Sequence, residues 1–154
     1  MELKSFYKIR FNDCDSFKHL HNSNYIDMML NAREDHLKTF HQLEMPDLYQ
    51  KGLSWMVSSH EIIYLRPAFY YETVCIHSAL VKASDDSLLV EMLMKDEKET
   101  HVKALLWTKF IHVNAQTNKR AKHPDWFLEL AQSIEDKSFG SISTVKERLT
   151  TLLG

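Results

Sequence analysis

The chain is 154 residues long, about the length of one domain, and such a chain can bury a core without help from disulfides or metals. Apolar residues make up 44% of it and charged residues 26%, proportions that exclude a disordered or fibrous protein. Its formal net charge of -2 at pH 7 excludes a general electrostatic attraction to nucleic acid or to an acidic membrane surface.

The two cysteines, Cys14 and Cys75, are far apart in the sequence and have neither metal-binding nor redox spacing. The N-terminus does not resemble a signal peptide, and no apolar run approaches the roughly 18 residues that a membrane span requires. We therefore expect a protein of the reducing cytoplasm that neither spans a membrane nor binds nucleic acid.

The chain begins with an expected strand and a polar loop. Residues 2–11 alternate irregularly between apolar and polar side chains, which favours a strand over a helix. Residues 13–21 have no consistent period and are rich in side chains that compete for backbone hydrogen bonds. This second segment holds two carboxylates and two histidines, so we expect it to be the loop on which chemistry is mounted.

A helix of about five turns is predicted after this loop. From Asn22 to about Phe40, apolar residues recur on one helical side and polar residues on the other. Asn22 or Asn24 is expected to cap its first turn. Pro46 and Gly52 interrupt the chain between this helix and the next predicted element.

The middle of the chain is predicted to form four strands separated by turns. They cover residues 55–65, 74–81, 88–94 and 102–113. Arg66-Pro67 ends the first of them, and polar clusters at residues 84–87 and 95–100 separate the others. Consecutive strands joined in this way favour a largely antiparallel meander.

The tail of the chain is predicted to return to helix. Residues 125–134 are amphipathic after Pro124, and Thr144 with Glu147 has the spacing of a capping box before a second short helix. A strand, a long helix and four further strands predict an α+β fold, in which an antiparallel sheet of about five strands covers its apolar face with the one long helix.

Three motifs in this order resemble a known family. Asp15, His19, Asn22 and Tyr25 match its acid after the first strand and its Asn or His before a Tyr-containing helix. The helix then carries Ala32-Arg33, and a later segment reads Tyr64-Leu65-Arg66-Pro67-Ala68. On these residues the chain resembles the hotdog-fold thioesterases of the 4-hydroxybenzoyl-CoA thioesterase-like superfamily.

The resemblance implies one hotdog domain over residues 1–154, with a core at about 3–124 and a C-terminal helical extension at 125–154. It implies a homodimer or a dimer of dimers, because the family pairs two sheets edge to edge with each active site between subunits. No cofactor is expected besides CoA as part of the substrate. The family usually has glycine before the loop histidine, and here that residue is Lys18. Lys18 either changes the loop shape or points its ammonium toward the ligand.

The expected reaction is hydrolysis of a thioester, which needs a base or nucleophile and a donor for the oxyanion. The resemblance makes Asp15 the base or nucleophile, although an aspartate in a loop also forms Asx turns. Asn22 is expected to orient the water or the thioester, or only to cap the helix. The backbone amides of Ser23 and Asn24 are candidates for the oxyanion hole.

The remaining candidates concern ligand binding. His19 is assigned to the catalytic set, with a solvated or structural role as the alternative, and Tyr25 either contacts substrate or belongs to the core. Lys18 and Arg66 are the expected substrate-binding cations, although scattered surface charge is often only solvated. Other cations available for the CoA phosphates are Lys82, Lys109, Lys119 and Arg120.

No metal site is expected in the loop, because two aspartates followed by two histidines in this spacing match no defined zinc or calcium motif. Two other functions stay open on the same fold. One is an enoyl-CoA hydratase or dehydratase. These enzymes pair a catalytic histidine with an acid on the helix, and His19 with Glu34 resembles that pair only loosely. The other is a module that binds acyl-CoA without catalysis. The acyl group itself, and CoA versus an acyl carrier protein, are not predicted.

Overall fold

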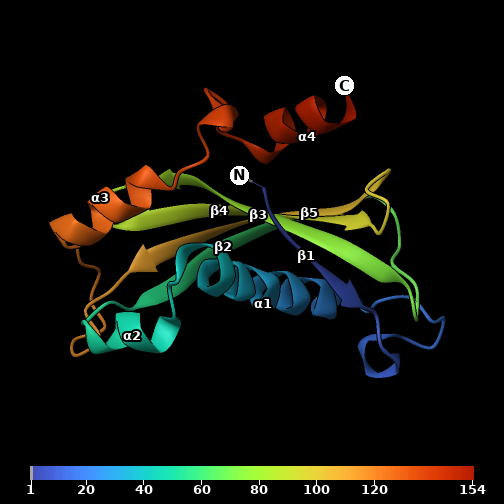
Figure 1. Cartoon of the computed structure of the whole chain (residues 1–154), viewed down its shortest axis with the longest axis horizontal. Helices are drawn as coiled ribbons and strands as arrows, with labels where there is room; N and C mark the ends of the chain where they lie inside the picture. Colours follow the sequence, from blue (N-terminus) through green and yellow to red (C-terminus); the bar gives the residue numbers. More distant parts are fainter. Residues whose placement is uncertain (1) are drawn as a thin grey trace. The chain divides into compact units, whose positions relative to one another are not determined.

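The computed structural model describes residues 2–154 and shows an α+β fold (Figure 1). The strands are β1 (Leu3–Lys8), β2 (Trp55–Tyr64), β3 (Thr73–Ala83), β4 (Ser87–Asp96) and β5 (Val102–His112). The α-helices are α1 (Asn22–His41), α2 (Met45–Gln50), α3 (Asp125–Ser133) and α4 (Val145–Leu153). Short 3-10 helices lie at η1 (Phe11–Asp13) and η2 (Lys137–Phe139). The predicted fold class is confirmed.

The antiparallel sheet of residues 2–154 has five strands in the order β1-β3-β4-β5-β2. Strands β3, β4 and β5 form the predicted meander. The expectation that β2 continues it is wrong, because β2 pairs with β5 and not with β3. The connection from Leu65 to Glu72 explains the difference, since it is too long for a tight hairpin and contains Pro67, which cannot donate to a strand ladder.

The chain divides into two compact units. The first comprises residues 1–47, 62–78 and 92–106, and the second comprises residues 48–61, 79–91 and 107–154. Strands β2 to β5 each contribute residues to both units, so this division does not test the prediction of one domain over residues 1–154.

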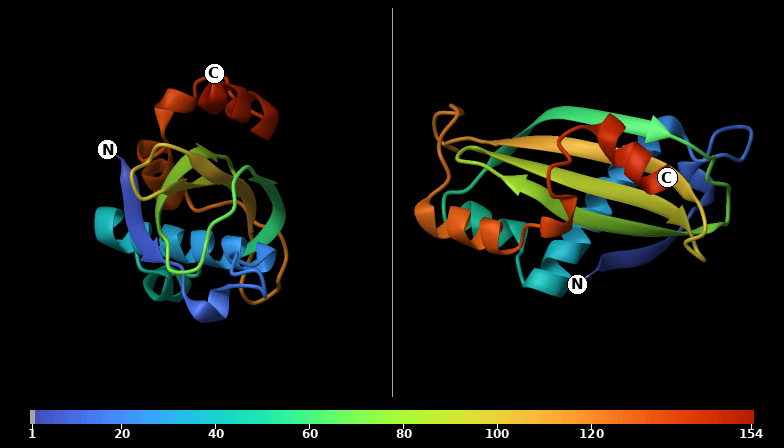
Figure 2. Two further views of the ribbon diagram at one scale, coloured as in Figure 1. Left: turned by 90° about the vertical axis from the view of Figure 1, so that its right-hand side faces the viewer. Right: turned by 90° about the horizontal axis from the view of Figure 1, so that it is seen from above.

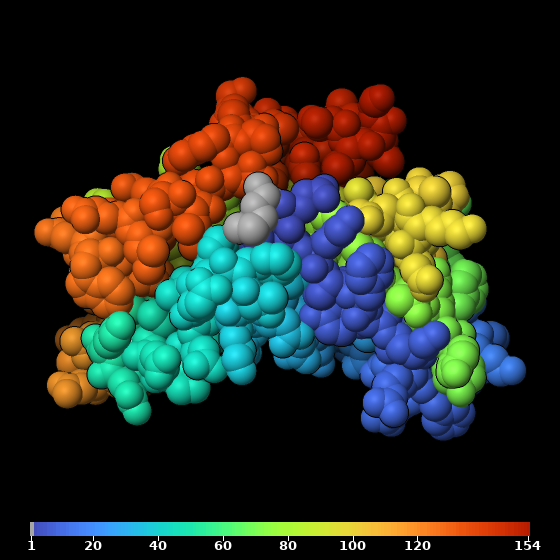
Figure 3. All heavy atoms as spheres, in the orientation of Figure 1, coloured from blue at the N-terminus to red at the C-terminus, as the bar shows by residue number. Residues whose placement is uncertain are grey.

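In the first unit, α1 packs its apolar side against strands. Tyr25, Met29, Ala32 and His36 are buried and recur at the spacing of one helical face. On β3, Val74 and Ile76 likewise have no exposed surface. His36 contacts Ser78 of this strand, and α1 also contacts β1. Figures 2 and 3 show α1 and β1 beside each other in ribbon and space-filling form.

Polar side chains beneath α1 form a connected network in the same unit. Arg33 Nη1 donates to Ser78 Oγ (3.0 Å), and Ser78 Oγ lies 2.6 Å from His36 Nδ1. On its other side, His36 Nε2 lies 2.7 Å from Ser5 Oγ. These bonds satisfy polar groups that would otherwise be costly to bury, and they tie α1 to β1 and β3.

The prediction that Asn22 or Asn24 caps α1 is wrong. His21 is the N-cap, and its Nδ1 accepts the amide of Ser23 at 3.2 Å. Asn22 is the first helical residue, while the side chain of Asn24 donates to the carbonyl of Asp13 (2.9 Å). Histidine can replace the usual capping residues here because a neutral ring nitrogen is also a hydrogen-bond acceptor.

In the second unit, the predicted C-terminal helices are present. The amide of Asp136, between α3 and η2, donates to the carbonyl of Leu80 (2.9 Å). Thr144 caps α4 and accepts the amide of Glu147 (3.1 Å), as the sequence predicts. Arg148 from α4 makes an ion pair with the buried Glu91 of β4. Among residues 2–154, helices with the length and hydropathy of a membrane span are absent.

Candidate active site

The loop between β1 and α1 contains a tight hairpin that fixes Asp15. The amide of Asp15 donates to the carbonyl of His19 (2.9 Å), and the amide of Lys18 donates to the carbonyl of Asp15 (3.1 Å). A three-residue turn of this kind places its third residue in the left-handed region, where glycine is usual. Lys18 takes that position with a φ of 63°. Lys18 therefore takes a backbone conformation that glycine adopts without strain.

Residues that follow β2 anchor the other side of this hairpin. The amide of Tyr70 donates to the carbonyl of Lys18 (2.8 Å), and the amide of Leu20 donates to the carbonyl of Ala68 (2.7 Å). The ring of His19 also meets that of Phe69 edge-on, with centroids 5.0 Å apart. The hairpin is thus attached to the segment after β2 that carries the third family-like motif, and the two motifs form one site.

The carboxylate of Asp15 stabilises its own loop and also lines a cavity. Its Oδ1 accepts the amides of Phe17 (2.9 Å) and His19 (3.2 Å), as in an Asx turn. Among the described residues, no group donates a hydrogen bond to Oδ2, so this oxygen is available to a ligand. The structural and catalytic interpretations of Asp15 are compatible.

A cavity of about 260 Å³ brings together most of the candidate residues. Its lining residues are Asp15, His19, Leu20, Asn22, Tyr25, Tyr64, Leu65, Arg66 and Pro67. Five residues predicted from the sequence are in this set. Because Asn22 opens α1, the cavity lies at the positive end of that helix, where developing negative charge is stabilised.

The two amides proposed for the oxyanion hole are engaged elsewhere. The amide of Ser23 donates to His21 Nδ1, and that of Asn24 donates to the carbonyl of His21 at 2.8 Å. Neither residue lines the 260 Å³ cavity. The expectation that these amides face the ligand is therefore corrected, and the reason is the histidine cap that the sequence pattern did not reveal.

Tyr64, the first residue of the third family-like motif, also lines this cavity. Its hydroxyl donates to the carbonyl of Asn22 (3.2 Å), and its ring meets that of Tyr25 edge-on at 5.1 Å. The hydroxyl of Tyr25 accepts the amide of Ala68 (3.0 Å), and burial raises the pKa of this phenol. Tyr25 therefore supports the site wall, whereas Tyr64 is half exposed and faces the ligand side.

Lys18 lies in a second, smaller cavity of about 180 Å³. This cavity is lined by Phe11, Asn12, Cys14, Asp15, Lys18 and Tyr70. Asp15 thus lines both cavities. Arg66 lines the larger one, and Lys18 lines the smaller one. Burial, with the charges of Asp13 and Asp15, raises the pKa of the Cys14 thiol and so disfavours its thiolate.

Of the cations considered for CoA, Arg66 is exposed and lines the larger cavity. In the part of the chain that the structure describes, its guanidinium has no ion-pair partner. Arg120, in contrast, is paired with Asp86, whose carboxylate lies 2.6 Å from its Nε. Glu34, which a hydratase would need near His19, is exposed on α1 and is not a residue of the cavity.

A five-stranded antiparallel sheet that packs against one long helix places the chain in the hotdog class of folds. Residues 9–130 match the model of the thioesterase-like superfamily, and since this is most of the chain, the protein belongs to that family. No curated protein matches it in sequence.

Solved structures share this fold at low identity. The chain is similar to YbaW, a probable thioesterase from Escherichia coli, with 22% identity, a TM-score of 0.74, and coverage of 86% of this chain and 99% of the other. The DHNA-CoA thioesterase of Staphylococcus aureus gives 20% identity, a TM-score of 0.75, and coverage of 86% and 89%. A hypothetical protein from Staphylococcus aureus in complex with CoA gives 11% identity, a TM-score of 0.75, and coverage of 94% and 96%.

Proposed function

We propose that the protein is an acyl-CoA thioesterase, which uses water to convert an acyl-CoA to a carboxylic acid and free CoA. The observation that carries this proposal is the cavity at the N-terminus of α1 in which Asp15, Asn22 and Arg66 meet. Membership of the thioesterase-like superfamily supports the reaction class, and the CoA complex of a structural neighbour supports the ligand class.

Asp15 supplies the base or the nucleophile. As a base, Oδ2 takes a proton from the water that attacks the thioester carbon. As a nucleophile, Oδ2 attacks that carbon itself and CoA leaves as the thiolate. Water then hydrolyses the mixed anhydride and supplies the proton that converts the thiolate to the thiol. In either case, the hydrogen bonds from Phe17 and His19 to Oδ1 hold the carboxylate in one orientation.

Asn22 is the proposed donor to the oxyanion. Its side-chain amide is the donor, and the residue both lines the cavity with Asp15 and opens α1 at the positive end of the helix dipole. Tyr64 holds the carbonyl of Asn22 and so fixes the start of the helix. His19 and Tyr25 shape the wall, while Arg66 and Lys18 are the proposed contacts for the phosphates of CoA.

We also propose that two copies pair through β2. This strand lies at one end of the sheet order, its residues 56–61 are exposed, and Met56 and Val57 are 54% and 46% exposed. A long exposed edge strand is a template for pairing with another chain. Light scattering is expected to give the mass of a dimer or tetramer, and a Val57→Lys variant should shift it to the monomer. A wild-type protein that is monomeric at micromolar concentration would contradict this pairing.

The proposed activity is tested by a screen for thiol release across short, long and aromatic acyl-CoAs, with hydration of crotonyl-CoA measured in parallel. Turnover of at least one thioester above background, without hydration of crotonyl-CoA, is the expected result. Hydration without thiol release would indicate the hydratase alternative. Tight binding of CoA with only background turnover of the whole panel would indicate a binding module.

A further inference from the structure

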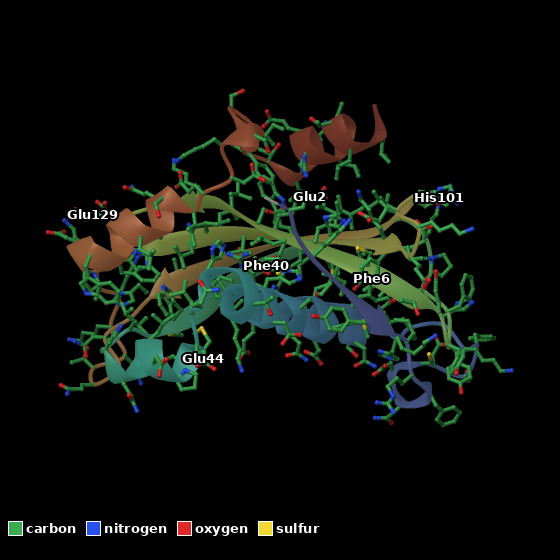
Figure 4. All side chains as sticks on the ribbon, in the orientation of Figure 1. Glu2, Phe6, Phe40, Glu44, His101 and Glu129 are labelled. Atoms are coloured by element: carbon green, nitrogen blue, oxygen red, sulfur yellow. The ribbon has the colours of Figure 1, made fainter. Side chains whose placement is uncertain are left out.

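A second cluster of chemically reactive side chains lies in the first unit. None of its residues lines the Asp15 cavity. Cys75 and His77 are two residues apart on β3, so their side chains point to the same face of the sheet. Glu99 comes from the turn between β4 and β5, which also holds the His101 labelled in Figure 4. The Sγ, ring-nitrogen and carboxylate-oxygen atoms of the three residues all lie within 4.8 Å of one another.

Each residue of the cluster already has a defined contact. His77 Nε2 donates to Glu99 Oε1 (2.6 Å), and Lys4 Nζ donates to Glu99 Oε2 (2.8 Å). The register of β1 against β3 pairs Lys4 with His77 and Phe6 with Cys75. Cys75 has no exposed surface, while the side chains of His77 and Glu99 are 14% and 25% exposed. The cluster therefore has a buried sulfur and a solvent-facing side through which an ion can enter.

We propose that Cys75 Sγ, His77 Nε2 and Glu99 Oε1 form a binding site for Zn²⁺, with a water molecule as the fourth ligand. A thiolate, an imidazole and a carboxylate are the three ligand types that zinc accepts in proteins. Given metal–ligand bonds of about 2.0–2.3 Å, neighbouring ligand atoms of a tetrahedral site lie roughly 3.3–3.6 Å apart. To reach this geometry, the Nε2–Oε1 pair opens from 2.6 Å and Sγ, which lies within 4.8 Å of both atoms, approaches them by side-chain rotation.

Lys4 supports the site as an outer contact. It binds Oε2 of Glu99, so that Oε1 can exchange its bond with His77 for a bond with the metal, and the carboxylate stays oriented. Zn²⁺ with the Cys75 thiolate and the Glu99 carboxylate is neutral, and Lys4 adds one positive charge. Glu99 also has a φ of 59°, a left-handed conformation in which glycine or asparagine is more usual.

Zinc binding has a defined proton balance. The Cys75 thiol loses its proton as the sulfur–zinc bond forms, and the proton that His77 Nε2 donates to Glu99 moves to Nδ1. One proton is therefore released for each ion bound. Burial raises the pKa of Cys75 to about 11, with Glu99 and Glu2 adding to this effect while Lys4 and Lys95 oppose it.

The experiment is a titration of the purified full-length protein, stripped with a chelator and kept reduced, with Co²⁺ as a spectroscopic substitute for Zn²⁺. The expected result is saturable binding of one Co²⁺ per chain with a thiolate-to-cobalt charge-transfer band, which Zn²⁺ then abolishes. Cys75→Ser and His77→Gln should lose the band. Matched controls are Cys14→Ser and His101→Gln, which change the same residue types outside the cluster and should keep it.

Two results would overturn the proposal. One is the absence of a charge-transfer band at saturating Co²⁺ in the wild-type protein, which would leave the cluster as an ion-pair group only. The other is a band that survives in Cys75→Ser or in His77→Gln. Because Cys75 is buried, circular dichroism must show that Cys75→Ser is folded. If Cys75→Ser is unfolded, the variant of the more exposed His77 tests the site. The readout does not depend on thioesterase activity.

Discussion

Two carboxylates of this protein have opposite surroundings. Glu91 is 3% exposed, and both of its oxygens accept hydrogen bonds: Oε2 from Trp107 Nε1 (2.9 Å) and Arg148 Nε (2.8 Å), and Oε1 from Arg148 Nη2 (2.9 Å). Asp15 is exposed, and the hydrogen bonds that the described residues make to its carboxylate all go to Oδ1. Glu91 is therefore fully used in attaching α4 to its strand, whereas Asp15 keeps an oxygen for chemistry. Variants can separate these two roles.

Apart from Asp15 itself, the strongest effect is expected at Asn22, beside it in the cavity. Asn22→Ala removes the side chain that lines the cavity beside Asp15, and we expect kcat to fall by about 10²–10³-fold, as for other oxyanion-hole donors. Asn31→Ala, a change of the same residue type on the same helix but outside this cavity, should leave kcat within a factor of about two. Steady-state thiol release measures both variants. Equal kcat values for them would remove Asn22 from the mechanism.

Glu91→Gln should act on stability instead. The amide cannot serve Arg148 and Trp107 as the carboxylate does, so the free energy of unfolding should fall by about 3 kcal/mol. Glu129→Gln, an exposed change on α3 (Figure 4), should alter it by less than about 0.5 kcal/mol. Urea unfolding gives both values. If Glu91→Gln is as stable as its control, the buried ion pair does not hold α4 in solution.

The buried His36 predicts a pH dependence of stability. Burial, and then the charge of Arg33, lowers its pKa from 6.5 to about 4. Between these values the unfolded chain binds a proton that the folded chain does not, so stability is complete above about pH 6.5 and is lost as pH falls toward 4. From pH 7 to pH 5 the loss from this residue is about 2 kcal/mol.

Urea unfolding of His36→Gln at the two pH values measures this contribution. Between pH 7 and pH 5, the free energy of unfolding of the variant should fall by about 2 kcal/mol less than that of the wild type, since glutamine does not titrate. His101→Gln, on an exposed turn, should keep the wild-type dependence. A His36 variant with an unchanged slope would place the acid sensitivity in other groups.

The weakest effect concerns Lys18. Its left-handed φ of 63° is a conformation that glycine adopts without strain, so Lys18→Gly should raise the free energy of unfolding by roughly 0.5 kcal/mol. If the ammonium also contacts CoA, KM should rise while kcat stays the same. Thermal unfolding and steady-state kinetics distinguish the two effects. A loss of stability would mean that the loop of Lys18 differs from the hairpin described.

The sequence was sufficient for the parts of the fold that depend on local patterns. The start of α1 after the polar loop, the strand texture of the middle of the chain and the cap at Thr144 follow from periodicity and turn chemistry. The position of β2 beside β5 depends on pairing between distant segments, which single-chain periodicity does not encode. The same holds for His21 as a cap, because its competitors Asn22 and Asn24 have stronger average preferences.

The candidate site was predictable where a motif contains its residues. Asp15, Asn22 and Arg66 came from the family resemblance, and they line one cavity. The engagement of the Ser23 amide follows from the orientation of the His21 ring, which the sequence does not define. The cluster of Cys75, His77 and Glu99 was also not visible, because it forms only when the β4–β5 turn folds next to β3.

The catalytic role of Asp15 is decided by the ratio of kcat/KM between the wild type and Asp15→Asn, on the best acyl-CoA of the screen. Asparagine keeps the Oδ1 acceptor for Phe17 and His19, so the loop should stay folded while the acid is lost. We predict a fall of about 10³-fold with unchanged CoA affinity. Hydrolysis by Asp15→Asn at the wild-type rate would contradict the assignment of Asp15 and the mechanism built on it.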